Sequence, residues 1–155
     1  MSDYRKKNIA LVIGSGGVMC AAAIGMWRIF RDEGITFDRI VGCSGGSLYA
    51  ASIALDMGVA EMEALSTRLW TTDIMRGYTT NLKASKDGSL RFNERSGLVD
   101  DSVLNENLKQ VYGSLSFSDL PVPLTIVATD LIAGEKVMLS EGNLLDAIRA
   151  SLPVN

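Results

Sequence analysis

The hydrophobic residues of this chain occur in two patterns that alternate along its length. Short continuous apolar runs end in glycine or in polar residues, which is typical of strands buried in a parallel sheet. Longer stretches carry apolar residues at helical spacing. The predicted strands are residues 8–13, 37–42 and 123–131, and the predicted helices are residues 20–33, 45–57, 59–76 and 102–112. Strands that alternate with helices predict an α/β fold with right-handed crossovers.

The remaining segments complete this prediction. Residues 133–135 are expected to turn, residues 136–139 to return as a short strand, and Asn143 to cap a final helix that runs to residue 150. The polar segment 83–97 has no clear period, so we predict a solvated loop, with a lid or a lipid-facing loop as the alternative.

The whole pattern predicts a single domain over residues 1–155, folded as a three-layer α/β/α sandwich. Its central sheet is expected to be mainly parallel, with helices on both faces. Because few strands can be recognised and no polar tail closes the sequence, we expect the chain to be part of a longer one.

Composition narrows the class of protein. With 47% hydrophobic and 21% charged residues, the chain can bury a core. The formal net charge of −3 argues against a nucleic-acid partner, since phosphate binding requires a basic surface. No signal peptide is visible, and no apolar stretch reaches the about 18 residues that span a membrane. With only Cys20 and Cys43, we expect a cytoplasmic protein with reduced thiols.

The chain contains no histidine, which limits the chemistry it can perform. A Ser-His-Asp triad cannot be built from these residues, nor can a histidine-ligated metal site. A serine nucleophile would therefore need a base of another residue type, and a carboxylate is the first candidate. We expect neither a metal nor a cofactor.

Residues 42–46, Gly-Cys-Ser-Gly-Gly, fit the pattern G-x-S-x-G between a predicted strand and a predicted helix. In this context the serine sits on a sharp turn at the carboxyl edge of the sheet, and the glycines permit the turn. Ser44 is therefore the candidate nucleophile, with Gly42, Gly45 and Gly46 forming its elbow. The alternative is a glycine-rich turn that only packs a helix on the sheet.

Residues 14–17, Gly-Ser-Gly-Gly, close the first strand and open the first helix. A dinucleotide fingerprint fails because Met19 stands where its third glycine belongs, and no Gly-Lys-Ser/Thr follows to make a P-loop. Successive backbone N–H groups here can instead form an oxyanion hole beside Ser44. The alternative is a turn that merely joins strand to helix.

Asp130 ends the third predicted strand on the carboxyl side, where α/β sheets place their sites. It is the one carboxylate of the chain that we consider as a base for Ser44. The alternative is an aspartate that caps a turn through backbone N–H groups.

Taken in order, these motifs resemble the patatin-like phospholipases. The matching stretches are residues 9–17, 42–47, 123–131 and 145–151. The resemblance implies a lipid acyl hydrolase, a phospholipase, lysophospholipase or carboxylesterase, which acts through a Ser-Asp dyad. It makes Ser44 the nucleophile and assigns the oxyanion hole to the backbone of Gly16, Gly17 and Val18. The implied partners are a lipid or acyl-ester substrate and a membrane surface that is contacted peripherally.

Two departures from the family pattern leave alternatives open. The family aspartate sits in Asp-Gly-Gly or Asp-Gly-Ala, and neither occurs in residues 1–155, so we expect that aspartate beyond Asn155. Met19 and Cys20 replace a basic residue and a glycine of the family's glycine loop. A catalytically silent domain that binds lipid or protein is therefore the first rival, and a nucleotide-binding α/β module that uses the Gly14 loop is the second.

Overall fold

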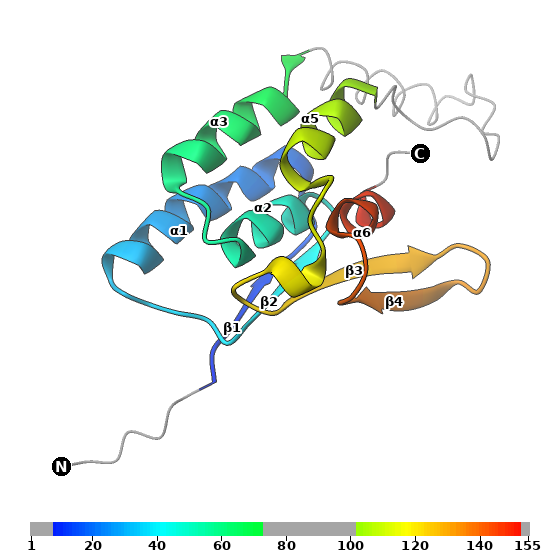
Figure 1. The fold of residues 1–155 in the computed structure, drawn as a ribbon, viewed down its shortest axis with the longest axis horizontal. Coiled ribbons are helices and arrows are strands. Elements are labelled where there is room, and N and C mark those ends of the chain that lie inside the picture. The colour runs from blue at the N-terminus through cyan, green and yellow to red at the C-terminus, as the bar shows by residue number, and fades with distance from the viewer. Residues whose placement is uncertain (1–7, 73–101, 153–155) are drawn as a thin grey trace.

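The computed structural model describes residues 8–72 and 102–152, and these form one sheet covered by helices (Figure 1). The strands are β1 (Ala10–Ile13), β2 (Arg39–Cys43), β3 (Leu124–Asp130) and β4 (Glu135–Leu139). The helices are the 3₁₀ helices η1 (Gly17–Ala21) and η2 (Phe117–Asp119) and the α-helices α1 (Ala22–Asp32), α2 (Gly45–Ala54), α3 (Val59–Leu69), α5 (Ser102–Tyr112) and α6 (Leu144–Ser151). The predicted loop 83–97 lies outside the described residues.

The sheet has the order β1-β2-β3-β4, and its first three strands run parallel. β4 returns antiparallel to β3 through a tight turn that includes Gly134 at φ +68°. The predicted strands are therefore adjacent in one sheet, and the α/β class with a mainly parallel sheet is confirmed.

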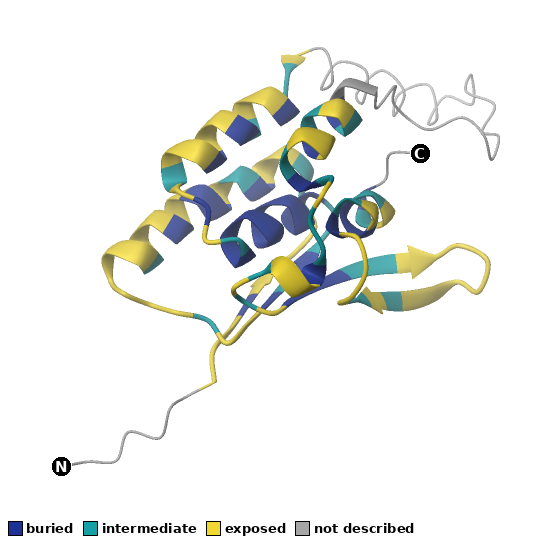
Figure 2. Cartoon of the chain, in the orientation of Figure 1, coloured by how far each residue is buried: buried dark blue, intermediate teal, exposed yellow. Residues whose placement is uncertain are grey.

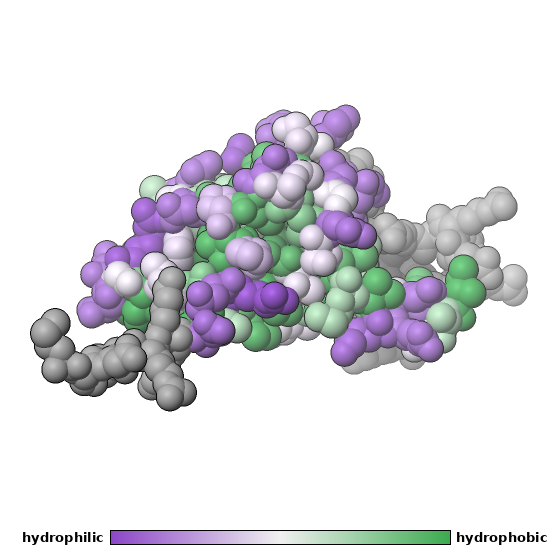
Figure 3. All heavy atoms as spheres, turned by 60° about the horizontal axis from the view of Figure 1, so that its bottom comes forward, coloured by the Kyte–Doolittle hydropathy of each residue, from purple (hydrophilic) through white to green (hydrophobic). Residues whose placement is uncertain are grey.

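The described α-helices lie on one side of the sheet (Figure 1). The order β1-β2-β3 explains this, because two right-handed crossovers that step in the same direction place their helices on the same face. Of the predicted three layers, the described residues thus supply the sheet and one helical side. On the opposite face, Val12 is 67% and Met138 58% exposed, and apolar side chains are visible at this surface (Figure 3).

The core lies between the sheet and the helices, and α2 is its centre (Figure 2). Every residue of α2 is buried. Ile40 and Ile126 pack on it from the sheet, and both are fully buried. The Tyr112 hydroxyl joins α5 to α2 by hydrogen bonds to Ser52 Oγ (2.8 Å) and to the Leu48 carbonyl (3.2 Å).

No helix in residues 8–72 or 102–152 is long and apolar enough to cross a membrane. The same residues contain no cluster of three or more cysteine or acidic side chains that could hold a metal ion.

Candidate active site

Ser44 occupies a sharp turn between β2 and α2. β2 ends at Cys43 and α2 begins at Gly45, so the reversal of chain direction falls on this one residue. Its backbone has φ 53° and ψ −131°, a conformation that residues with a side chain rarely adopt. Such strain persists only where the surrounding structure holds it, and it is concentrated at functional sites.

Hydrogen bonds hold the backbone of Ser44 from both sides. Its carbonyl accepts from the Ser47 amide (2.8 Å) and from Ser47 Oγ (2.6 Å). Its amide donates to Ser151 Oγ (2.7 Å), which in turn donates to the Val127 carbonyl (2.7 Å). Ser151 is the last residue of α6, so a helix that comes late in the chain fixes the turn.

The glycines of the elbow permit close contact with neighbouring backbone. A Cβ on Gly42 would lie 2.7 Å from the Ser47 Cα, and one on Gly45 would lie 2.8 Å from the Gly17 Cα. A Cβ on Gly46 would overlap the Gly14 carbonyl oxygen. The elbow and the glycine loop 14–17 are therefore packed directly against each other.

The glycine loop leads into η1, which continues as α1. Gly17 has φ +54°, a left-handed conformation that glycine adopts without a steric penalty. The Gly16 carbonyl accepts from the Met19 amide at 3.1 Å, which starts the helical turn. The first amides of a helix have no partner within it, so those of Gly17 and Val18 are placed as donors at the loop.

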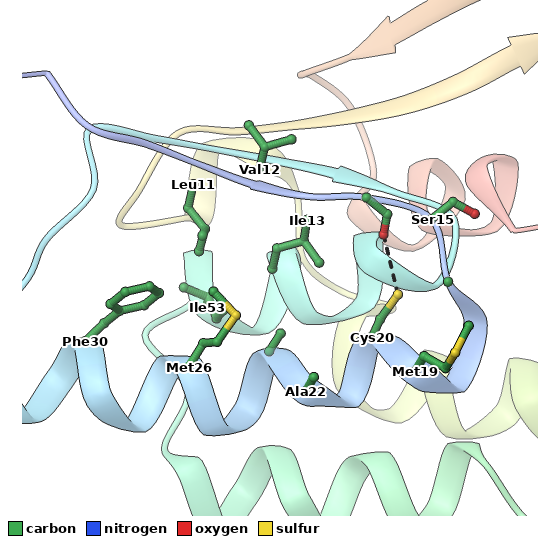
Figure 4. A pocket seen from close by; sticks show the side chains of 13 residues that line it. Leu11, Val12, Ile13, Ser15, Met19, Cys20, Ala22, Met26, Phe30 and Ile53 are labelled. Carbon is green, nitrogen blue, oxygen red and sulfur yellow. Dashed lines mark hydrogen bonds between the residues drawn. The ribbon is translucent and has the colours of Figure 1, made fainter.

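Cys20 contacts the glycine loop through its side chain. Its thiol donates to the Gly14 carbonyl at 3.4 Å (Figure 4). Burial raises the pKa of this thiol, which keeps it protonated at neutral pH. Cys20 is thus a packing residue of the loop and a poor nucleophile.

An apolar cleft of about 310 Å³ opens between β1 and the η1–α1 segment (Figure 4). The glycine loop borders it at one end, whereas Ser44 is not among the residues that line it. Its side chains come from both elements and include Leu11, Ile13, Met19, Met26 and Phe30.

Asp130 caps the β3–β4 turn. Its Oδ1 accepts the amides of Ile132 (2.8 Å) and Ala133 (3.1 Å). The Ala133 and Ile132 N–H groups lower the pKa of this exposed carboxyl, which makes it a weaker base. Of the two predicted roles, the structure shows the cap.

Sequence reasoning placed Ser44 and both glycine segments at the edge where the structure has them, but it assigned no site role to Ser151. The only local signal was its place at the end of the last helix. Ser151 lies 107 residues from Ser44 in sequence, and no periodic pattern reports such a contact.

The parallel sheet and the strand–serine–helix turn define an α/β protein with a tight turn at the carboxyl edge of its sheet. The sequence profile of the Patatin-like phospholipase family matches residues 11–154. The chain belongs to this family.

The relatives of this chain include proteins named for the NTE family and for neuropathy target esterase. The chain is 29% identical over 146 residues to an uncharacterized NTE family protein of Mycobacterium tuberculosis. The match covers 94% of this chain and 37% of that protein. It is 26% identical over 148 residues to the neuropathy target esterase sws of Drosophila sechellia, covering 96% of this chain and 10% of that protein. The chain thus spans well under half of these relatives.

Two crystal structures share the fold. VipD of Legionella pneumophila matches with a TM-score of 0.55 and 15% identity, over 92% of this chain and 41% of VipD. ExoU of the Pseudomonas aeruginosa type III secretion system, solved in complex with SpcU, matches with a TM-score of 0.55 and 17% identity. That match covers 96% of this chain and 39% of ExoU.

Proposed function

We propose that this chain carries the nucleophile and the oxyanion hole of a lipid acyl hydrolase, with Ser44 as the nucleophile. The observation that carries the proposal is the strained backbone of Ser44, held at the end of β2 and packed through Gly45 on the glycine loop. Membership of the patatin-like phospholipase family supports ester hydrolysis as the reaction. The proposed substrates are lipid or acyl esters, met at a membrane surface that a cytoplasmic protein contacts peripherally.

The proposed reaction has two steps. Ser44 Oγ attacks the ester carbonyl while a base takes its proton, and the oxyanion is held by the amides of Gly16, Gly17 and Val18. The base then gives this proton to the leaving oxygen, and the alcohol departs to leave an acyl-enzyme. Water then adds to the acyl carbon and gives a proton to the same base, which passes it to Ser44 Oγ as the fatty acid leaves. The amino end of α2 points at the serine and favours the negative charge that develops there.

We further propose that the base is an aspartate outside residues 1–155. The chain has no histidine, and Asp130 is engaged in its turn. A serine hydroxyl without a base is a weak nucleophile at neutral pH. The 155-residue chain alone is therefore expected to hydrolyse esters several orders of magnitude more slowly than a longer natural form.

The test compares the longest natural form, its Ser44→Ala variant and the 155-residue chain. Each is incubated with a fluorophosphonate probe and assayed with short-chain esters and phospholipids. We expect labelling and hydrolysis in the long form and neither in Ser44→Ala. A long form that is folded but as inactive as Ser44→Ala would overturn the proposal.

That outcome would favour the second candidate, a catalytically silent domain that binds lipid or protein. Met19 favours it, because this residue is 77% exposed at the glycine loop, where the family usually has a basic residue.

A further inference from the structure

The hydrogen bonds between β2 and β3 follow the regular parallel pattern up to the elbow. The Ile40 amide donates to the Pro123 carbonyl at 2.9 Å, one residue before its register partner Leu124. In a parallel ladder every second residue repeats this bond. The bond expected from Ser44 would therefore go to the carbonyl of Val127.

A hydroxyl group occupies the place of that bond. Ser151 Oγ accepts from the Ser44 amide and donates to the Val127 carbonyl, each at 2.7 Å. The Ser151 hydroxyl thus links the backbones of the two strands where the chain leaves the sheet. We propose that Ser151 is the positioning residue of the nucleophile, because its hydroxyl replaces the last β2–β3 bond and sets the orientation of the elbow.

α6 holds this hydroxyl in place. Asn143 caps the helix by accepting the Asp146 amide at 3.0 Å, and Leu144, Ala147 and Ile148 are buried in the core. The amide of Leu152 bonds back to the carbonyl of Ile148, so the last turn that carries Ser151 is closed. The hydroxyl therefore belongs to a packed element.

The role requires a group that accepts one hydrogen bond and donates another, and Ser or Thr provides both. It also commits the Ser44 amide to Ser151. The oxyanion donors then come from the glycine loop, as in the proposed function on which this inference rests.

The experiment uses the longest natural form and three variants. Ser151→Ala removes the hydroxyl, and Ser151→Thr keeps it. Ser52→Ala is the matched control, because Ser52 Oγ also bridges two partners, the Leu48 carbonyl and the Tyr112 hydroxyl, within the core. The measurements are fluorophosphonate labelling at increasing probe concentration, hydrogen exchange of the Ser44 amide, and the thermal midpoint.

In Ser151→Ala we expect the maximal labelling rate to fall about tenfold to a hundredfold, because a small displacement of a nucleophile has this effect. The probe concentration for half-maximal rate should stay the same. The Ser44 amide should exchange about tenfold faster or more, since its hydrogen bond is lost. Ser151→Thr should restore both values, whereas Ser52→Ala should lower the thermal midpoint and leave both unchanged.

Wild-type labelling rates in a folded Ser151→Ala would overturn the inference, as would equal losses in Ser151→Ala and Ser52→Ala at equal thermal midpoints. If the wild type itself is not labelled, the proposed hydrolase function fails. The exchange measurement then still tests whether Ser151 holds the Ser44 amide. Unchanged exchange of the Ser44 amide in Ser151→Ala would then overturn the contact.

Discussion

At the scale of the residue, the glycines of the elbow are explained mainly by contact. Gly46 lies so close to the carbonyls of Ile13 and Gly14 that a methyl group has no space. Backbone atoms cannot rotate away as the end of a flexible side chain can. Glycine is required here because the elbow and the end of β1 are in direct contact, which the pattern G-x-S-x-G by itself does not reveal.

Gly46→Ala should therefore destabilise the protein by about 1–3 kcal/mol, the usual cost of overpacking a core. It should also slow labelling of Ser44. Gly25→Ala is the control, because no atom lies within 4 Å of the added Cβ and alanine favours the helix by about 0.5–1 kcal/mol. Chemical denaturation of both variants checks this, and a Gly46→Ala protein as stable as Gly25→Ala would contradict the packing argument.

Asp130→Asn should leave the labelling rate of Ser44 within about twofold of wild type, because surface changes away from a site have small effects. The exposed carboxylate is bound to the amides of Ile132 and Ala133, and they lower its pKa. The rate is measured with the fluorophosphonate probe. Loss of labelling without loss of stability would identify Asp130 as the base.

At the scale of the element, hydrophobic periodicity predicted most of the fold because each element has its own pattern. The strands and α5 lie where the pattern places them, and α6 begins after Asn143 as predicted. The helix predicted over 59–76 ends as α3 at Leu69, and the segment before α1 is a 3₁₀ turn that begins at Gly17. The helix predicted over 45–57 ends as α2 at Ala54, and all three differences lie at ends of helices, where periodicity is least informative.

The candidate site likewise has one part that could be predicted from the sequence and one part that could not. The turn at Ser44 and its glycines was predictable, since a tight turn from strand to helix requires a local sequence pattern. The bond from Ser151 was not, because it depends on how α6 packs on β3. Tertiary packing of that kind leaves no repeat in the sequence.

Asn143→Ala should destabilise the protein by about 0.5–2 kcal/mol, the usual loss for a helix N-cap. The Asn143 side chain accepts the Asp146 amide and also donates to the Gly113 carbonyl at 3.3 Å. Urea denaturation measures the loss. Because α6 positions Ser151, the Ser44 amide should also exchange faster in this variant, and unchanged exchange would mean that the end of α6 is held independently of its start.

At the scale of the whole molecule, polar groups join the helices to one another in addition to the apolar contacts of the core. α5 is bound to α2 through the Tyr112 hydroxyl. α1 is bound to the turn between α2 and α3 through Trp27 Nε1, which donates to the Met57 carbonyl at 2.9 Å. Arg28 and Glu63 form an ion pair between α1 and α3 at 2.7 Å, but both are exposed, and such pairs contribute little.

Tyr112 should make the stability of the fold sensitive to alkali. Burial raises the pKa of its phenol above the ordinary value of 10.0. The folded state then keeps a proton that the unfolded state loses, so stability is retained below that value and falls as the pH rises above it. In Tyr112→Phe this part of the fall should disappear, and stability near neutral pH should drop by about 1 kcal/mol for the lost hydrogen bonds. Denaturation across the alkaline range measures both, and equal slopes in the two proteins would contradict the assignment.

The complete burial of α2 has a consequence for how this protein can change over evolution or by design. The helix that begins directly after Ser44 has no exposed residue, so a larger side chain along it must displace packed atoms and would pass that displacement to Ser44. For the proposed hydrolase, changes in substrate preference are therefore expected on the surrounding elements. A mutational library intended to alter specificity would do best to hold residues 42–54 constant and to vary exposed positions such as Val18 and Met19.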